Sequence, residues 1–307
     1  MDATKNSHIA LIGTVTPDGM LLHTLIGLSF GLLLFLVASG FTLTFGLARF
    51  VNLSHGATFL VASHVAAEVD RHVDVFAAAV LAAVATGIVV AVAVFGLARL
   101  RWQAITADPT RQVLFTFGCL LVIADLVRNR WDGIPLSVLL PNGLDGSFSI
   151  GDTTFPVYRV FVMAAAVVIA VGVWWLQERT RFGAMVRAGA DDREQLEALG
   201  IRTDLLFLAV FALAGGLAGL AGGLGVPLSG ASIGQEFSML IMALVAVVVG
   251  GLGSLKGAFI ASVLVGLVDA YGKAWLPTFA SFTIMALVVA VLAVRPAGLV
   301  DRSAGAH

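Results

Sequence analysis

The stretch Met20–Phe45 reads MLLHTLIGLSFGLLLFLVASGFTLTF and contains no Asp, Glu, Lys or Arg. A helix needs about 20 predominantly apolar residues to cross about 30 Å of hydrocarbon. This stretch is therefore long enough to span a membrane, and similar runs recur along the chain, among them Val75–Ala98 and Phe279–Val294.

The composition of the whole chain agrees with that interpretation. Of 307 residues, 59% are hydrophobic and 12% are charged, whereas soluble domains carry about 25% charged residues. A net charge of -1 argues against a nucleic-acid surface, which needs clustered positive charge. The single cysteine, Cys119, excludes an internal disulfide and any CxxC motif. We therefore expect a protein surrounded by a lipid bilayer, with no nucleic-acid partner.

Long and uniformly apolar runs favour membrane helices over a membrane β-barrel, whose strands would alternate over about ten residues. We predict an all-α integral membrane protein, a polytopic bundle of about 8–9 transmembrane or re-entrant helices that forms one transmembrane domain over residues 1–307. The polar segment 1–19 precedes the first run, which we interpret as a retained helix and not a signal peptide. The expected spans are 20–47, 52–69, 74–98, 112–128, 157–177, 204–225, 237–252, 257–275 and 279–295.

Basic residues gather in particular loops, and such loops tend to stay in the cytoplasm. This rule predicts that the loop 178–203 is cytoplasmic and that the loop 129–156 is extracytoplasmic. The N-terminus is outside if 52–69 crosses fully and inside if that segment is re-entrant. Within the outer loop, Ser147–Ile150 and Thr153–Phe155 are β-prone and flank Gly151-Asp152, which predicts a small hairpin. The basic residues expected inside are Arg99, Arg101, Arg111, Arg179, Arg181, Arg187, Arg193, Arg202, Arg295 and Arg302.

Small residues recur at helical spacing. Gly215, Gly219 and Gly223 are four residues apart and share one stripe of a helix, and Gly253 and Gly257 repeat the interval. Such stripes let two helix backbones approach closely in lipid. We expect them to serve packing within the chain in preference to a dimer seam.

The segment 178–202 is the longest strongly charged stretch. Asp191, followed three residues later by Glu194, fits a capping box with Asp as the cap, and Gly200 can supply a left-handed stop. A short helix from about Asp192 to Leu199 is predicted. 

On that helix Leu196 and Leu199 would share an apolar edge, while Arg193, Glu194 and Glu197 would leave the rest polar. A helix of this kind fits into a groove on a partner or lies on the membrane surface. The alternative is a solvated linker helix.

Three stretches carry a resemblance to a known family: FGLARFVNLSHG at Phe45–Gly56, RTRFG at Arg179–Gly183 leading to EALGI at Glu197–Ile201, and GGLGSLKG at Gly250–Gly257. The chain resembles the permease subunits of ATP-binding cassette importers for branched-chain amino acids. In two places the match is looser, because Leu199 replaces the second alanine of a Glu-Ala-Ala signature, and Leu53 and Ser54 stand where relatives often carry an aromatic residue and an alanine.

The resemblance implies a set of partners: a second homologous permease subunit, two cytoplasmic ATPase subunits that use ATP, and a periplasmic solute-binding protein, all at a bacterial inner membrane. It also implies that the 178–203 loop contacts an ATPase. The residues expected to take part are Arg187, Asp191, Arg193, Glu194, Leu196, Glu197, Ala198, Leu199 and Gly200.

Polar residues at membrane depth usually face a cavity or another helix. Asn52, Ser54 and His55, next to Gly56, are therefore expected either to line the translocation path or to form a hydrogen-bonded turn that breaks a helix.

His64, Glu68 and His72 have a spacing that can hold a metal, but with no further ligands in sight we interpret them as interfacial polar residues. The stretch Gly251–Gly257 lacks the Gly-Lys-Ser/Thr order of a Walker A loop. We accordingly expect no metal site and no cofactor bound by this chain.

Two acidic residues lie in apolar runs. Asp269 has Lys273 one turn later, and Asp125 has Arg128 three residues later. Ion pairing at the ends of helices is the favoured interpretation, and a proton relay is the alternative.

We thus expect a transport subunit that is not an enzyme and forms half of a path for branched-chain or other hydrophobic amino acids, driven by separate ATPases. The alternatives are a permease for urea or short amides, a proton-coupled secondary carrier and a structural membrane scaffold.

Overall fold

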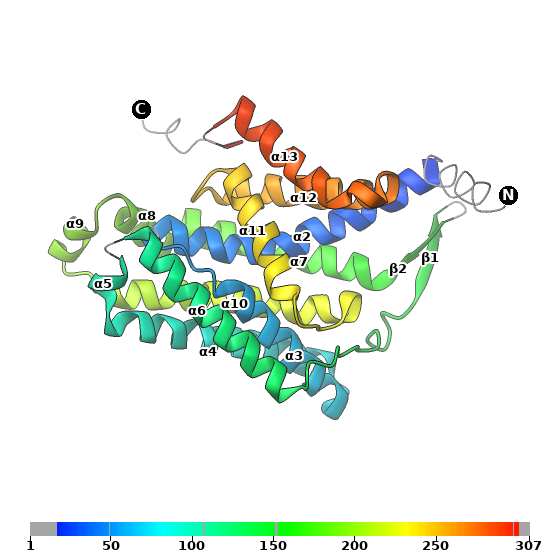
Figure 1. The fold of residues 1–307 in the computed structure, drawn as a ribbon, viewed down its shortest axis with the longest axis horizontal. Coiled ribbons are helices and arrows are strands. Elements are labelled where there is room, and N and C mark those ends of the chain that lie inside the picture. Colours follow the sequence, from blue (N-terminus) through cyan, green and yellow to red (C-terminus); the bar gives the residue numbers. More distant parts are fainter. Residues whose placement is uncertain (1–16, 49, 107, 151–152, 297, 301–307) are drawn as a thin grey trace.

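The computed structural model describes residues 17–48, 50–106, 108–150, 153–296 and 298–300. Most of the helices lie side by side along the long axis of the molecule (Figure 1). The helices are α2 (Pro17–Ala48), α3 (His55–Val73), α4 (Phe76–Leu100), α5 (Trp102–Thr106), α6 (Pro109–Arg130), α7 (Val157–Arg179), α8 (Arg181–Asp191), α9 (Arg193–Ala198), α10 (Thr203–Ser229), α11 (Gln235–Gly250), α12 (Leu255–Trp275), the 3-10 turn η1 (Pro277–Phe279) and α13 (Ala280–Val294).

The expected all-α membrane fold is confirmed. By length and composition, seven of the described helices can cross a membrane: α2, α4, α6, α7, α10, α12 and α13 together with η1. The two other predicted spans are the shorter helices α3 and α11. α11 has 16 residues, and α3 carries Glu68, Asp70 and Arg71 near its end.

The two ends of the bundle differ in the elements that they carry. The short helices α5, α8 and α9 lie at one end, which we call the α9 end, and the strands β1 (Ser147–Ile150) and β2 (Thr153–Pro156) lie at the other, the hairpin end (Figure 1). The predicted hairpin is confirmed: the strands pair antiparallel, with Ser147 opposite Pro156. Its turn, Gly151-Asp152, lies outside the described residues, as does most of the polar segment 1–19, although α2 already includes Pro17.

Two three-helix units follow the same plan. In each, a long helix is followed by an irregular connection, a short helix and a second long helix: α2–α3–α4 and α10–α11–α12. α2 runs from the hairpin end toward the α9 end, and α10 runs the opposite way (Figure 1). The units are therefore inverted relative to each other, an arrangement that recurs in membrane transport proteins.

The units are interleaved through their long helices. The two most extensive helix contacts are α10 with α4 and α2 with α12. Glycines permit both contacts. A Cβ at Gly27 of α2 would lie 2.8 Å from the carbonyl oxygen of Gly266 in α12, and one at Gly215 of α10 would overlap the carbonyl oxygen of Gly87 in α4. Because lipid provides no hydrophobic drive between helices, this close backbone approach is what holds the units together.

The short helices begin inside the bundle. His55, the first residue of α3, contacts Val37 and Gly40 in the middle of α2. Gly56 packs so closely on the first turn of α11 that a Cβ would overlap the carbonyl oxygen of Glu236. The N-termini of α3 and α11 therefore meet within the molecule. From there α3 runs to the hairpin end (Figure 1). Residues 50–54 are the irregular connection that leads into it.

Candidate functional site

The connection that precedes α3 is irregular backbone in the interior, where each polar group needs a partner. Two side chains of α6 provide them. The backbone N–H of Val51 donates to Gln112 Oε1 at 3.2 Å, and that of Leu53 donates to Thr116 Oγ1 at 3.1 Å. Thr116 Oγ1 also lies 3.2 Å from the carbonyl oxygen of Val51. Gln112 and Thr116 therefore stabilise the extended segment.

Asn52, Ser54, His55 and Gly56 lie at this break and are all buried. Ser54 Oγ donates to Asn52 Oδ1 at 2.6 Å. His55 Nε2 lies 2.9 Å from the carbonyl oxygen of Val37. None of the four lines the central cavity described next. Their contacts are those of a hydrogen-bonded break in a helix, and their expected place on the translocation path stays a prediction.

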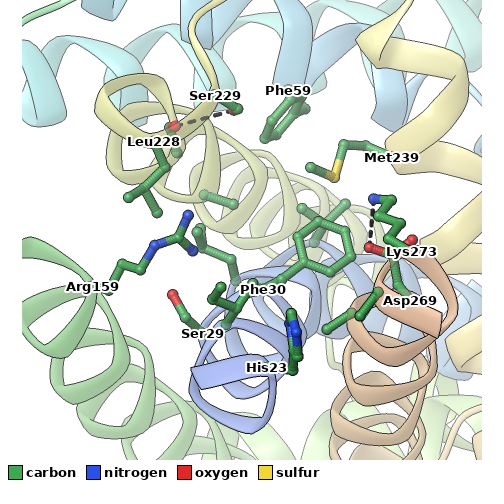
Figure 2. A pocket seen from close by; sticks show the side chains of 17 residues that line it. His23, Ser29, Phe30, Phe59, Arg159, Leu228, Ser229, Met239, Asp269 and Lys273 are labelled. Carbon is green, nitrogen blue, oxygen red and sulfur yellow. Dashed lines mark hydrogen bonds and ion pairs between the residues drawn. The ribbon is translucent and has the colours of Figure 1, made fainter. Parts of the chain in front are cut away.

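A cavity of about 380 Å³ lies between the two inverted units. It is bounded by α2, α3, α7, α10, α11 and α12 (Figure 2). Small-molecule sites usually enclose about 300–1,000 Å³, so the cavity has room for one small solute. Its apolar wall includes Phe30, Leu33, Phe59, Leu228 and Met239, and its polar lining includes His23, Ser29, Arg159, Ser229, Asp269 and Lys273.

The charged groups of the cavity have different partners. Lys273 Nζ lies 2.6 Å from Asp269 Oδ2, which confirms the predicted pairing. Arg159 projects into the cavity from α7 (Figure 2) and makes no hydrogen bond or ion pair with another described residue.

The second predicted pair, Asp125 with Arg128, is wrong: both residues are described, no ion pair joins them, and Asp125 Oδ2 accepts from Asn129 Nδ2 at 3.3 Å. Asp125 is exposed on the surface of α6.

The charged segment 178–203 forms two helices, one more than the sequence predicted. α8 begins after Thr180, whose hydroxyl accepts from the backbone N–H of Gly183 at 3.2 Å. It packs back on α7, where Arg187 donates to the carbonyl oxygen of Gln177 and lies 4.0 Å from Glu178. The single predicted helix missed α8 because its buried face consists of few residues, chiefly Gly183 and Val186.

α9 corresponds to the predicted short helix, with a corrected cap. The N-cap is Asp192, whose carboxylate accepts from the backbone N–H of Gln195 at 3.0 Å; Asp191 instead ends α8. The stop is as predicted, since Gly200 has a φ of 79°. Its N–H donates to the Glu197 carbonyl, and the N–H of Ile201 donates to the Leu196 carbonyl, which is the Schellman arrangement.

The apolar edge expected on α9 is divided between the interior and the surface. Leu196 is 3% exposed and joins the main hydrophobic core, whereas Leu199 is 78% exposed. Glu197 Oε1 accepts from Thr203 Oγ1 at 2.6 Å, which ties α9 to the start of α10, and Ala198 is exposed. Of this edge, Leu199 alone is free to contact a partner. The side chains of Asp191, Arg193 and Glu194 lie outside what the structure describes.

The predicted glycine stripe lies at the contact between α10 and α4. Gly215 and Gly219 meet the backbone of α4, and a Cβ at Gly223 would lie 3.1 Å from Ala83 Cβ. Gly253 is not in a helix as its spacing with Gly257 had implied. It has a φ of 82° in the turn between α11 and α12, while Gly257, in the first turn of α12, packs against Gly250.

The residues His64, Glu68 and His72 do not converge on one point. The His64 ring lies 5.3 Å from the ring of Trp131, and Glu68 accepts from Trp131 Nε1 at 3.3 Å. His72 bonds to the Glu68 carbonyl. Across the described residues, no group of three or more His, Cys, Asp or Glu that could hold a metal is found.

Comparison with known proteins identifies the chain. Residues 23–294 match the family model described as the permease component of branched-chain amino acid transport systems, and this range covers most of the chain. The chain belongs to this family. It is a permease subunit of a branched-chain amino acid importer of the ATP-binding cassette class, as its three motifs predicted.

Three relatives show how much of this permease is covered by the similarity. The permease protein BraD of the high-affinity branched-chain amino acid transport system of Pseudomonas aeruginosa is 25% identical over 288 residues, which cover 90% of this chain and 94% of BraD. The corresponding protein LivH of Escherichia coli is 26% identical over 297 residues, with the same coverage. A probable LivH of Methanocaldococcus jannaschii is 27% identical over 143 residues, which cover 43% of this chain and 45% of the relative. No solved structure matches significantly.

The family membership makes the permease a multi-pass membrane protein whose class of importer works with ATPase and solute-binding partners. Permease subunits of this family are transport components and not themselves enzymes.

Sequence reasoning missed most of the permease's cavity. Ser29 and Phe30 give no signal within an apolar run, and Arg159 lies at the start of the predicted span 157–177, on the outer side, where the charge rule expects few basic residues. An unpaired arginine near the start of an apolar span was the one available signal.

Proposed function

We propose that the chain forms half of a translocation path for branched-chain or other hydrophobic amino acids, and that the transported solute binds in the central cavity. The observation that carries the proposal is the cavity itself. It lies between two inverted helical units, and it combines an apolar wall with a few charged side chains. Transporters with inverted units hold solute at such an interface and expose it alternately to the two sides.

Separate ATPase subunits would supply the driving force through the segment 178–203. Three contacts support this part of the proposal. Arg187 fastens α8 to α7, the Glu197–Thr203 hydrogen bond fastens α9 to α10, and Arg99 pairs with Asp204 to join α4 to α10. A displacement of α9 would thus reach α7 and α10, which both border the cavity. The exposed Leu199 is the apolar anchor for the partner.

The rest of the assembly follows the family. We propose a second homologous permease subunit as a heterodimer partner, two cytoplasmic ATPase subunits that bind all the ATP, and a periplasmic solute-binding protein. The proposed location is a bacterial inner membrane, with the α9 end in the cytoplasm, because the helix ends and connections at that end hold Arg99, Arg101, Arg111 and Arg181.

The decisive experiment reconstitutes the importer with its ATPases and binding protein and measures ATP hydrolysis and leucine uptake together. Leu199→Ser, Gly200→Ala and Glu197→Gln are each expected to lower the amount of leucine carried per ATP hydrolysed while membrane insertion remains normal. Leu139→Ser is the matched control, because Leu139 is 89% exposed in the outer loop. Unchanged coupling in all three variants contradicts the proposed role of the segment.

The same preparation separates the alternatives. Competition by urea or acetamide but not by valine would indicate a short-amide permease. Loss of uptake when the pH gradient is collapsed, with ATP still present, would indicate a proton-coupled carrier. Under the proposal, uptake depends on ATP and is insensitive to collapse of the gradient.

A further inference from the structure

Two polar groups in the central cavity have no partner within the described chain. Arg159 carries a positive charge and makes no hydrogen bond or ion pair with another described residue. Ser29 is 0% exposed, and its Oγ has no hydrogen-bond partner there. A buried hydroxyl without a partner is destabilising, and a partly buried cation needs a compensating anion. Both groups therefore call for an acceptor from outside the described residues.

These two groups lie on the same side of the cavity. In Figure 2 the Arg159 side chain enters from α7, and Ser29 of α2 lies on the same side of the view. A guanidinium donates two parallel hydrogen bonds to a carboxylate, and a hydroxyl can donate a third. Nothing else among the described lining residues on this side is anionic. The geometry therefore provides donors for one carboxylate.

The opposite side carries the only anion among the described lining residues, Asp269. Its Oδ2 is occupied by Lys273, but its Oδ1 accepts no hydrogen bond from a described residue. The Asp269 side chain is 10% exposed, whereas that of Lys273 is 63% exposed. Lys273 can therefore keep its contact with water while a second cation shares the carboxylate. An ammonium group of a solute is a cation of the right size.

Apolar side chains border the space between these sides. Phe30 projects between Arg159 and Asp269, with Phe59 and Met239 above it (Figure 2). Aromatic rings and a flexible thioether make an adaptable apolar surface. Branched aliphatic side chains of different length can pack on such a surface.

We propose that the cavity is a specific site for the zwitterion of an α-amino acid with an apolar side chain. Arg159 and Ser29 Oγ bind the α-carboxylate, Asp269 Oδ1 accepts from the α-ammonium, and Phe30, Phe59 and Met239 contact the side chain. This inference rests on the proposed function, and it adds recognition within the permease itself to recognition by the solute-binding protein.

Equilibrium binding of radiolabelled leucine tests the site directly. The membrane complex of permease and ATPase subunits is placed in nanodiscs, and binding is measured without added solute-binding protein. Leucinol, which lacks the carboxylate, and 4-methylpentanoate, which lacks the ammonium group, serve as competitors. Each is expected to bind at least about tenfold more weakly than leucine, because each loses charge-assisted hydrogen bonds.

Variants assign the two charges to named residues. Arg159→Gln is expected to raise the Kd of leucine about tenfold or more and to leave the Kd of leucinol unchanged, since leucinol has no carboxylate for Arg159 to bind. Arg159→Lys should recover part of the affinity, and Ser29→Ala should weaken leucine binding more than leucinol binding. Arg128→Gln is the control, because Arg128 is exposed and does not line the cavity; its Kd values should match those of the wild type.

The outcomes separate a failure of the proposed binding site from a failure of the proposed transport function. If the wild-type importer takes up leucine with ATP but the membrane complex binds leucine and leucinol equally, the site is wrong and the function stands. Equal leucine affinity in Arg159→Gln and wild type also overturns the site. If the reconstituted importer shows no ATP-dependent uptake of any branched-chain amino acid, the proposed function falls first.

Discussion

His55 Nε2 lies 2.9 Å from the carbonyl oxygen of Val37, and the same imidazole ring rests directly on Gly40 of α2. A carbonyl oxygen can only accept, so Nε2 carries the proton and donates. The first residue of α3 is therefore docked into the middle of α2 by one hydrogen bond and one glycine. This docking fixes where the short helix begins.

Gly40→Ala should disrupt that docking. A Cβ at position 40 would lie 2.8 Å from His55 Cε1 and 2.9 Å from the carbonyl oxygen of Ala214. Overpacking of this kind costs about 1–3 kcal/mol, which thermal unfolding of the detergent-solubilised protein can measure. Gly46→Ala on the same helix is the control, because its nearest contact is an ordinary 3.5 Å to Gly253 Cα. Equal stability of the two variants would show that α2 and α3 can move apart at this position without a measurable loss of stability.

Thr116→Val should destabilise the extended connection before α3. Valine keeps the shape of the side chain but removes the oxygen that accepts from Leu53 N–H. An unsatisfied buried donor costs about 1–3 kcal/mol, which a fall in the melting temperature would report. Thr110→Val, in the exposed first turn of the same helix, should have the melting temperature of the wild type. A melting temperature of Thr116→Val equal to that of this control would mean that water or another group satisfies Leu53.

Gly215→Ala should separate α10 from α4. The added methyl group would overlap the backbone of Gly87, which cannot move without the whole helix. Gly216→Ala, on the neighbouring face, would meet side chains and not backbone, namely Ile88 at 3.3 Å and Val84 at 3.8 Å. We expect the first variant to lose folded protein and uptake and the second to retain both, as measured by size-exclusion chromatography and transport. The reverse order of severity would contradict the packing described above.

Gly225→Leu should fill the central cavity without disturbing the helix. Gly225 lines the cavity, and a Cβ there meets no atom within 4 Å. The longer side chain would occupy space meant for solute, so leucine uptake should fall about tenfold or more while alanine uptake falls less, as expected when a pocket loses volume. Gly172→Leu, at an exposed and equally open position of α7, should transport normally. Normal leucine uptake by Gly225→Leu would place the path elsewhere.

Much of the fold could be predicted because the hydropathy of a segment by itself indicates whether that segment forms a membrane helix. The boundaries of α4, α7 and α12 follow from apolar runs, and the hairpin follows from two β-prone runs around Gly-Asp. The start of α3 could not be placed, because it depends on contacts of Asn52 and His55 with distant helices. The cap at Asp192 was misplaced by one residue because Asp191 and Asp192 are equally suited to cap.

The cavity could not be predicted from one chain. Its polar groups come from three helices that lie far apart in the sequence, with Ser29 in α2, Arg159 in α7 and Asp269 in α12. Each residue has an ordinary local explanation, and only their position around one cavity indicates a common role. Sequence periodicity places residues on a face, but it does not say which faces meet.

The pairing of α2 with α12 also constrains how the protein is made. Gly27 and Gly31 contact Gly266 and Ser262, so α2 can pair with α12 only after about 240 further residues have been synthesised. At about 5–20 residues per second, that delay is roughly 12–48 s. During it, the glycine face of α2 lies in the bilayer without its permanent neighbour, until synthesis is almost complete.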